Sequence, residues 1–284
     1  MKTPCSRHGY RATPFARDAV YPSAFAHAAV RARRAEASPT GKRLVDLTPA
    51  VMDQGSGEHG TGSCEGHGFS RAFTTRLAFL GTPLGFVASP EGLYTPARCL
   101  ERALFPEGPS EPLADDGTDG HAILRVAPEY GTRAMRAPTP DGRYSDCDAP
   151  TINAEPSLTD LEEAARCKLD VSSVSLVLGN EAEIAQQAAL LLDAGIPLVI
   201  EGAVDDAYMG LGPDAPTVTS IVQNPNGGHC QSVLDHRPGA NGLPEVEVWN
   251  SWGTSWARAG RVWVSSSVLA QQWAIYAVDV RRQP

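Results

Sequence analysis

The spacing of apolar residues divides the chain into a helical middle and a strand-rich last third. In five segments the apolar side chains recur every three or four residues, the period at which one face of a helix repeats. The predicted helices cover residues 63–80, residues 93–104, a segment around Ile123 and Val126 that Pro128 ends or kinks, residues 158–169, and residues 184–194, where Gly195 caps the helix.

The last third of the sequence consists of short apolar runs separated by Gly, Pro and Asn, a pattern typical of strands and turns. Six strands are predicted, at residues 196–201, 217–223, 231–236, 245–250, 261–265 and 274–280. All five tryptophans also fall in this part. Helices followed by strands indicate an α+β fold with two layers packed side by side, and a cleft between two such halves is a natural ligand site.

Composition narrows the class of protein. The chain has 284 residues, of which 42% are hydrophobic and 20% charged, as in a globular protein with a sizeable core. Its longest uninterrupted apolar runs are far too short to cross a bilayer. The net charge of −9 argues against non-specific nucleic-acid binding, which needs a basic surface. We therefore expect neither a membrane nor a nucleic acid as a partner.

The charge is unevenly distributed along the chain. Residues 1–43 hold nine basic and two acidic side chains and carry a net charge of +7, whereas the remainder carries −16. Opposite charges favour a basic segment that lies against the acidic body, although a solvated tail would explain the charges equally well.

The start of the chain and its cysteines bear on location. The opening sequence MKTPCSRHGYRATPF lacks the apolar stretch of a secretion signal. The six cysteines are widely spaced with no C-x-x-C pair, which argues against a zinc ribbon. We expect reduced thiols and a cytoplasmic location. Export by another route, with Cys147 paired to Cys167, stays open.

Three separated segments contain the residues best suited to chemistry. The first is DQGSGEHGTGSC at residues 53–64, which opens the first predicted helix. The second is GGH at residues 227–229, directly before a strand, and the third is WNSWGTSW at residues 249–256, at a strand end. Each motif is modest alone, but together they supply a thiol, an imidazole and two amides.

These four groups suit nucleophilic catalysis. The Cys64 thiol lies at a predicted helix N-terminus, whose dipole favours a thiolate, and the His229 imidazole could accept its proton and later protonate a leaving amine. The Asn250 amide would fix the imidazole ring and tautomer. The Gln54 amide, beside the thiol's own backbone N–H, would hold an oxyanion. Trp252 could shield the bond between the imidazole and Asn250 from water.

On these motifs the sequence resembles the papain-like cysteine peptidases of the C1 type. DQG…GSC resembles the loop from the family's Gln to its Cys, GGH the segment with the catalytic His, and NSWGTSW the Asn motif. SPEGLYTPAR, LADDGTDGHAILRVAPEYG and ALLLDAGIPLVIEG fit other family stretches, and GYRATPFARDAVYP is similar to a segment before the catalytic domain of bacterial members. The resemblance implies a Cys64 nucleophile, a His229 general acid/base, an orienting Asn250 and an oxyanion donor at Gln54.

The resemblance also implies an architecture. The family fold is a helical half and a β-barrel-like half that face each other across the active-site cleft. Residues 1–44 would form a basic extension, with a short propeptide as one interpretation, and residues 45–284 the catalytic domain. Its helical half would cover about 45–150 and its mainly β half about 151–284. Gly117 and Gly120 lie where the family's Gly-rich segment contacts substrate backbone, so both are candidate substrate-binding residues.

The sequence departs from the family in two places beside the nucleophile. The interval from Gln54 to Cys64 is four residues longer than the usual loop, with residues 57–60 as the insert. A longer interval would displace Gln54 from its oxyanion role unless the insert loops out, which a Gly-rich segment can do. Glu65 stands where many members have Trp, and a carboxylate there would oppose thiolate formation unless its side chain points to solvent.

The expected function is hydrolysis of peptide bonds in a peptide or protein substrate, without a cofactor. His59 and His67 flank the nucleophile, but no carboxylate or second Cys completes a metal site, so we interpret both as loop histidines. A catalytically silent binding protein and a Cys-dependent amide transferase or deamidase are the alternatives. The basic segment 1–43 is expected to restrain activity, so a chain starting near Lys42 would turn over faster.

Overall fold

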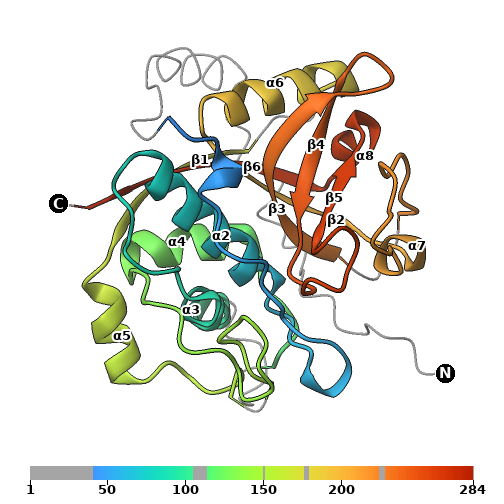
Figure 1. The fold of residues 1–284 in the computed structure, drawn as a ribbon. Helices are drawn as coiled ribbons and strands as arrows, with labels where there is room; N and C mark the ends of the chain where they lie inside the picture. The colour runs from blue at the N-terminus through green and yellow to red at the C-terminus, as the bar shows by residue number, and fades with distance from the viewer. Residues whose placement is uncertain (1–40, 105–113, 150, 176–178, 224–227, 284) are drawn as a thin grey trace.

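A computed structural model describes residues 41–104, 114–149, 151–175, 179–223 and 228–283 (Figure 1). Most of the basic segment, and with it the expected restraint of activity, lies outside the described residues. Gly227 of the GGH motif lies outside them as well.

The predicted helices are present, with shifted ends. Residues 158–169, predicted as one helix, form a helix only as far as Ala165, and its N-terminal cap is Ser157, whose side chain accepts a hydrogen bond from the Asp160 N–H. The helices are α2 (Cys64–Phe79), α3 (Pro90–Leu104), α4 (Gly120–Glu129), α5 (Leu158–Ala165), α6 (Glu181–Asp193), α7 (Asp206–Met209) and α8 (Ser266–Ala270), with short 3-10 helices η2 (Leu44–Asp46) and η3 (Gly57–His59).

The strands form one antiparallel six-stranded sheet with the order β1-β6-β2-β3-β4-β5. The first strand in sequence, β1, therefore lies at one edge of the sheet and pairs with the last strand, β6. The strands are β1 (Leu169–Ser175), β2 (Leu198–Ala203), β3 (Gly228–Pro238), β4 (Pro244–Trp249), β5 (Arg261–Val264) and β6 (Ala274–Arg282).

Two strand assignments from the sequence differ from the structure. The predicted strand at residues 217–223 is wrong, because only Val218 there forms a bridge, to Val264 in β5. Strand β1 was not predicted. Its first residue, Leu169, is buried and the next, Asp170, is exposed, but Leu169 had been assigned to the helix predicted at residues 158–169. The other five predicted strands correspond to β2–β6.

Helix α2 lies between the two halves of the molecule, with α3–α5 on one side of it and strands β2–β5 on the other (Figure 1). One apolar core joins α2, α3 and α4 to β1 and β6, and a second joins α6 and α8 to β2–β5. Buried Arg76 on α2 pairs with Asp279 on β6 at 2.8 Å and donates to the Gly195 carbonyl at 3.1 Å. The expected two-part α+β organisation is confirmed.

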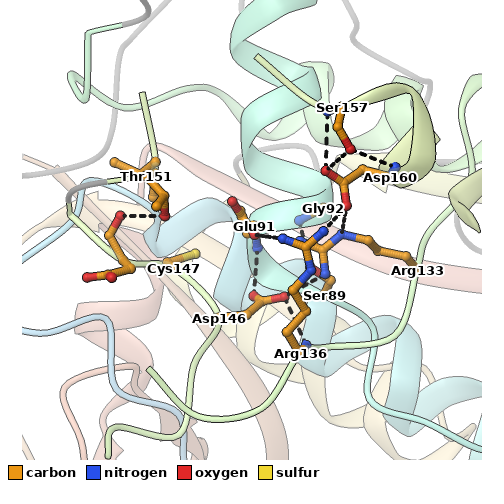
Figure 2. Close-up of polar contacts among 12 residues, drawn as sticks. Ser89, Glu91, Gly92, Arg133, Arg136, Asp146, Cys147, Thr151, Ser157 and Asp160 are labelled. Carbon is orange, nitrogen blue, oxygen red and sulfur yellow. Dashed lines mark hydrogen bonds and ion pairs between the residues drawn. The ribbon is translucent and has the colours of Figure 1, made fainter. Parts of the chain in front are cut away.

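A buried charge cluster organises the helical half (Figure 2). Only 3% of the Arg133 side chain is exposed, and its guanidinium contacts Asp146 at 2.9 Å, Glu91 at 2.5 Å and Asp160 at 3.7 Å. Arg136 also pairs with Asp160. The cluster joins the start of α3, the start of α5 and the segment between α4 and α5. We refer to these residues as the Arg133 cluster.

The cysteines that the structure describes are free, so Cys147 and Cys167 do not form the pair that the sequence left open. Within the described ranges no helix has both the length and the apolar character needed to cross a bilayer.

Candidate active site

Cys64 is the first residue of α2 and is fully buried. Its thiol accepts a hydrogen bond from the backbone N–H of Cys230, the residue that follows His229 on β3. The helix N-terminus and the start of β3 therefore meet at this sulfur. Burial, and then the neighbouring Glu65 carboxyl, raise the pKa of the Cys64 thiol well above its ordinary value, so a proton acceptor is needed for attack.

His229 and Asn250 form a hydrogen bond of 2.6 Å between Nε2 and Oδ1. The same Oδ1 accepts a 2.7 Å bond from the Ser251 backbone N–H, so it is an acceptor and Nε2 must donate. This tautomer makes Nδ1 the basic nitrogen of the ring. Trp252 stacks on the imidazole with ring centroids 4.4 Å apart, where it covers the ring as the sequence predicted.

Arg71 connects the helix of Cys64 to the strand end that holds Asn250. It is buried on α2 and donates to the backbone carbonyls of Trp249 at 3.0 Å and Asn250 at 3.1 Å. Burial lowers its pKa to about 10, so the guanidinium keeps its charge at neutral pH. Sequence reasoning missed this residue. Its position two helical turns after Cys64, among apolar residues of the same face, was the available signal.

Gln54 is buried and held by both neighbouring motifs. Its Nε2 donates to the Thr61 carbonyl at 2.8 Å, and its Oε1 accepts from the Ser251 hydroxyl at 2.5 Å. Its backbone N–H donates to the Ser251 carbonyl at 2.8 Å. An amide nitrogen has two hydrogens, so one remains for a further acceptor such as an oxyanion.

The long loop between Gln54 and Cys64 is closed at its base. Thr61 donates its backbone N–H to the Gln54 carbonyl at 3.0 Å, and between these two residues lies η3, where Glu58 and His59 are exposed. Gly55 has a φ of +81°, and a Cβ there would lie 2.3 Å from the His59 carbonyl oxygen. The insert is therefore accommodated beyond a closed base, and Gln54 stays adjacent to the other motifs.

Gly117 and Gly120 are buried, and their backbone N–H groups already have partners within the protein. Gly117 donates to the Tyr94 hydroxyl at 3.1 Å, and Gly120 donates to the Glu201 carboxyl at 3.1 Å. A Cβ on Gly120 would lie 2.5 Å from Glu201 Oε1. A substrate would therefore have to contact these two glycines through groups other than their backbone N–H. Their substrate-binding role stays a prediction.

The Glu65 side chain does not point to solvent. Solvent exposure therefore does not remove its effect on the Cys64 thiol. Its side chain is fully buried against Cys230 and the Glu201 carboxyl of β2. Burial, and then the charge of Glu201, raise the pKa of Glu65 well above its ordinary value. Burial therefore favours the protonated form of Glu65, which limits the repulsion between its carboxyl and a thiolate.

Glu201 is the second member of this acidic pair. It is fully buried, and its carboxyl accepts from the Gly120 N–H and from the Tyr276 hydroxyl at 3.4 Å. Burial, followed by the charge of Asp119, raises the pKa of Glu201 to about 8. The sequence offered one signal for this residue, a single acid inside the apolar run LVIEGA.

The two histidines near Cys64 differ in position and burial. His67 was interpreted as a loop residue, but it lies inside α2, fully buried, with Nδ1 2.8 Å from the Ser63 carbonyl and Nε2 2.8 Å from the Ser145 hydroxyl. Burial lowers its pKa to about 4, so it is a neutral structural residue. His59 is exposed in the looped-out insert.

Comparison with known proteins identifies the fold but not a sequence family. No family model matches the chain, and no curated protein matches it. Xylellain, a cysteine protease from Xylella fastidiosa, aligns over 96% of both chains with a TM-score of 0.61 and 15% identity. Procathepsin B S9 from Trypanosoma congolense aligns over 97% of this chain and 83% of its own, with a TM-score of 0.57 and 14% identity.

The bromelain protease from Ananas comosus, solved in complex with the E64 inhibitor, aligns over 84% of this chain and 97% of its own. Its TM-score is 0.53 and its sequence identity 12%. Identities this low establish a common architecture and leave the chemistry to be argued from the site. The chain has the two-lobed α+β fold of the papain-like cysteine proteases.

Proposed function

We propose that this protein is a cysteine peptidase of the papain-like C1 type, similar to bacterial members, and that it hydrolyses peptide bonds in peptides or proteins. The observation that supports this most is the convergence of three distant motifs. The Cys64 thiol contacts the backbone beside His229, and His229 is hydrogen-bonded to Asn250.

The first half of the reaction forms a thioester. His229 Nδ1 takes the proton of the Cys64 thiol as the sulfur attacks the carbonyl carbon of the scissile bond. The resulting oxyanion accepts hydrogen bonds from the second hydrogen of Gln54 Nε2 and from the Cys64 backbone N–H. The imidazolium then gives its proton to the leaving nitrogen, the carbon–nitrogen bond breaks, and the amine product departs.

The second half releases the acid product. His229 takes a proton from water, the hydroxide oxygen attacks the thioester carbonyl, and the carbon–sulfur bond breaks. The proton returns from the imidazolium to the sulfur. Asn250 holds the ring through its Oδ1 while Nδ1 gains and loses the proton, and Trp252 excludes water from that hydrogen bond.

The location is part of the proposal. The free cysteines of the described residues support a reducing compartment, for which the cytoplasm is the expected site.

The proposal is tested with the purified full chain and a mixed peptide library under reducing conditions. We expect cleavage by the parent protein and none by the Cys64→Ala variant. An epoxide that alkylates thiols irreversibly should add its mass to Cys64. Cys99→Ala, at a half-buried thiol on α3 outside the three motifs, is the matched control and should cleave like the parent.

Two results would contradict the proposal. One is a folded parent protein whose Cys64 is not alkylated at neutral pH and which cleaves no peptide, as a silent binding protein would behave. The other is formation of ligated product in preference to hydrolysis when an amine acceptor is added, which would indicate a transferase.

A further inference from the structure

A cavity of about 640 Å³ lies beside the proposed catalytic residues. Trp252 connects the two places, because it stacks on His229 and also lines the cavity. The looped-out insert forms part of the wall through Ser56 and His59. Residues at and after α7, together with Trp256, complete it on the side of the strand-rich half.

The position of this cavity determines which part of a substrate could reach it. In the proposed reaction His229 protonates the leaving nitrogen, so the C-terminal portion of the substrate lies on the imidazole side of the scissile bond. Trp252 covers the imidazole, and the cavity lies along Trp252. A side chain that follows the scissile bond can therefore enter it.

The wall combines apolar surface with unbalanced negative charge. Arg143 Nε is paired with Asp141 at 2.7 Å, so the charges of these two residues cancel. Asp53 accepts a hydrogen bond from the Gly55 N–H at 2.9 Å, and Asp206 is exposed in the first turn of α7. Among the described residues, neither of these carboxylates has an ion-pair partner within 4.0 Å.

The apolar part of the wall comes from Met209, Leu211 and Trp256. A long aliphatic stem that ends in a cation fits this combination, because its methylenes can pack on the apolar residues while its charge reaches Asp53 or Asp206. A neutral apolar side chain would leave the carboxylates without a partner, and an acidic one would be repelled.

We propose that this cavity is a subsite for an Arg or Lys side chain on the C-terminal side of the scissile bond. Asp53 and Asp206 are its specificity-determining residues. This inference rests on the proposed peptidase function and adds a substrate class to it.

The experiment compares peptides that differ at one position. Arg or norleucine is placed at each of the first three positions after the scissile bond, in an otherwise identical neutral peptide. At one position we expect kcat/KM for the Arg peptide to exceed that for the norleucine peptide by about tenfold, as for a charge-assisted contact. The Asp53→Asn, Asp206→Asn double variant should bring that ratio close to one.

Two controls keep the result interpretable. Asp170→Asn, at an exposed acid on β1 outside the cavity, should retain the parent ratio. In about 1 M salt, where charges are screened beyond about 3 Å, the parent ratio should fall while the double variant's ratio changes little. If the double variant misfolds, calorimetric binding of the Arg and norleucine peptides to Cys64→Ala provides the same comparison without turnover.

The outcomes separate the two proposals. Cleavage of the norleucine peptide by the parent but not by Cys64→Ala supports the peptidase whatever the cavity binds. An Arg-to-norleucine ratio near one at all three positions, or a raised ratio that survives in the double variant, overturns the cavity assignment alone.

Discussion

The Arg133 cluster and the interior beside Cys64 are both rich in carboxyl groups around a buried centre, yet guanidinium groups pair with the acids in the first, whereas two acids lie against each other in the second. In the cluster, burial raises the pKa of Glu91, and the Arg133 guanidinium opposes that rise. Beside Cys64, Glu65 and Glu201 contact each other, and burial and the neighbouring acid both raise the Glu65 pKa. Paired charges serve structure in the first region, whereas the acidic pair, which has no cation partner among the described residues, lies where chemistry is proposed.

The largest expected effect comes from breaking the Arg133 cluster. Arg133→Met should lower the free energy of unfolding by about 3–5 kcal/mol, because it leaves buried Asp146 without its cation and leaves half-buried Glu91 with the longer contact to Arg136 at 3.8 Å. Urea unfolding followed by circular dichroism measures this. Arg125→Met removes an exposed pair with Glu129 and should cost only about 0.5 kcal/mol. Equal losses in the two variants would mean that the cluster contributes no more than a surface pair.

The second-largest expected effect is a loss of activity, not of stability, and it tests the region around Cys64. Gln54→Glu preserves the size of the side chain but replaces the proposed oxyanion donor with an oxygen. We expect kcat to fall about 10²–10³-fold, equivalent to about 3–4 kcal/mol in the barrier. Steady-state kinetics on a cleaved peptide measures it, with Gln223→Glu at an exposed position as the control. A variant with unchanged kcat would remove Gln54 from the mechanism.

The smallest effect concerns pH and the acidic pair. Glu201 has a folded-state pKa of about 8, above its ordinary 4.5, so below pH 4.5 it is protonated in both states. Between these values the unfolded chain releases the proton and the folded chain retains it. Glu201 therefore contributes a loss of stability as the pH rises through this window, and Glu201→Gln should be more stable relative to the parent at pH 8 than at pH 5, by on the order of 2 kcal/mol.

Unfolding free energies at pH 5 and at pH 8 provide the measurement for Glu201→Gln. The exposed Glu163→Gln on α5 should leave the pH dependence of the parent unchanged. A Glu201→Gln variant whose stability changes with pH in the same way as that of the parent would contradict the assignment of a raised pKa to Glu201.

The fold class could be predicted from the sequence, and the motifs of Cys64, His229, Asn250 and Gln54, which the sequence and its family resemblance grouped, lie next to one another in the structure. These residues belong to compact motifs whose local spacing already indicates a helix start, a strand start and a strand end. The burial of the Glu65 side chain could not be predicted from local spacing in the same way. Its burial depends on Glu201, which reaches it only through the packing of β2 on α2.

The errors have similar causes. Residues 217–223 alternate like a strand, but beside β5 they make one bridge at Val218. Strand β1 was hidden because its first residue, Leu169, continues the apolar pattern of the preceding helix. Arg71 was missed because a single sequence does not reveal which carbonyls a buried guanidinium will reach.

The bond between Gln54 and Thr61 has a consequence for how this protein can diversify. Because this bond joins the two ends of the loop, residues between Gln54 and Thr61 can be added or removed while these two residues stay in place. Lengthening such a closed loop costs little, about 0.6 kcal/mol for each doubling. The tip can therefore change in length and composition over evolution, or by engineering, as an interchangeable module; if the cavity binds substrate as proposed, such changes would alter which peptides are accepted without altering the proposed catalytic residues.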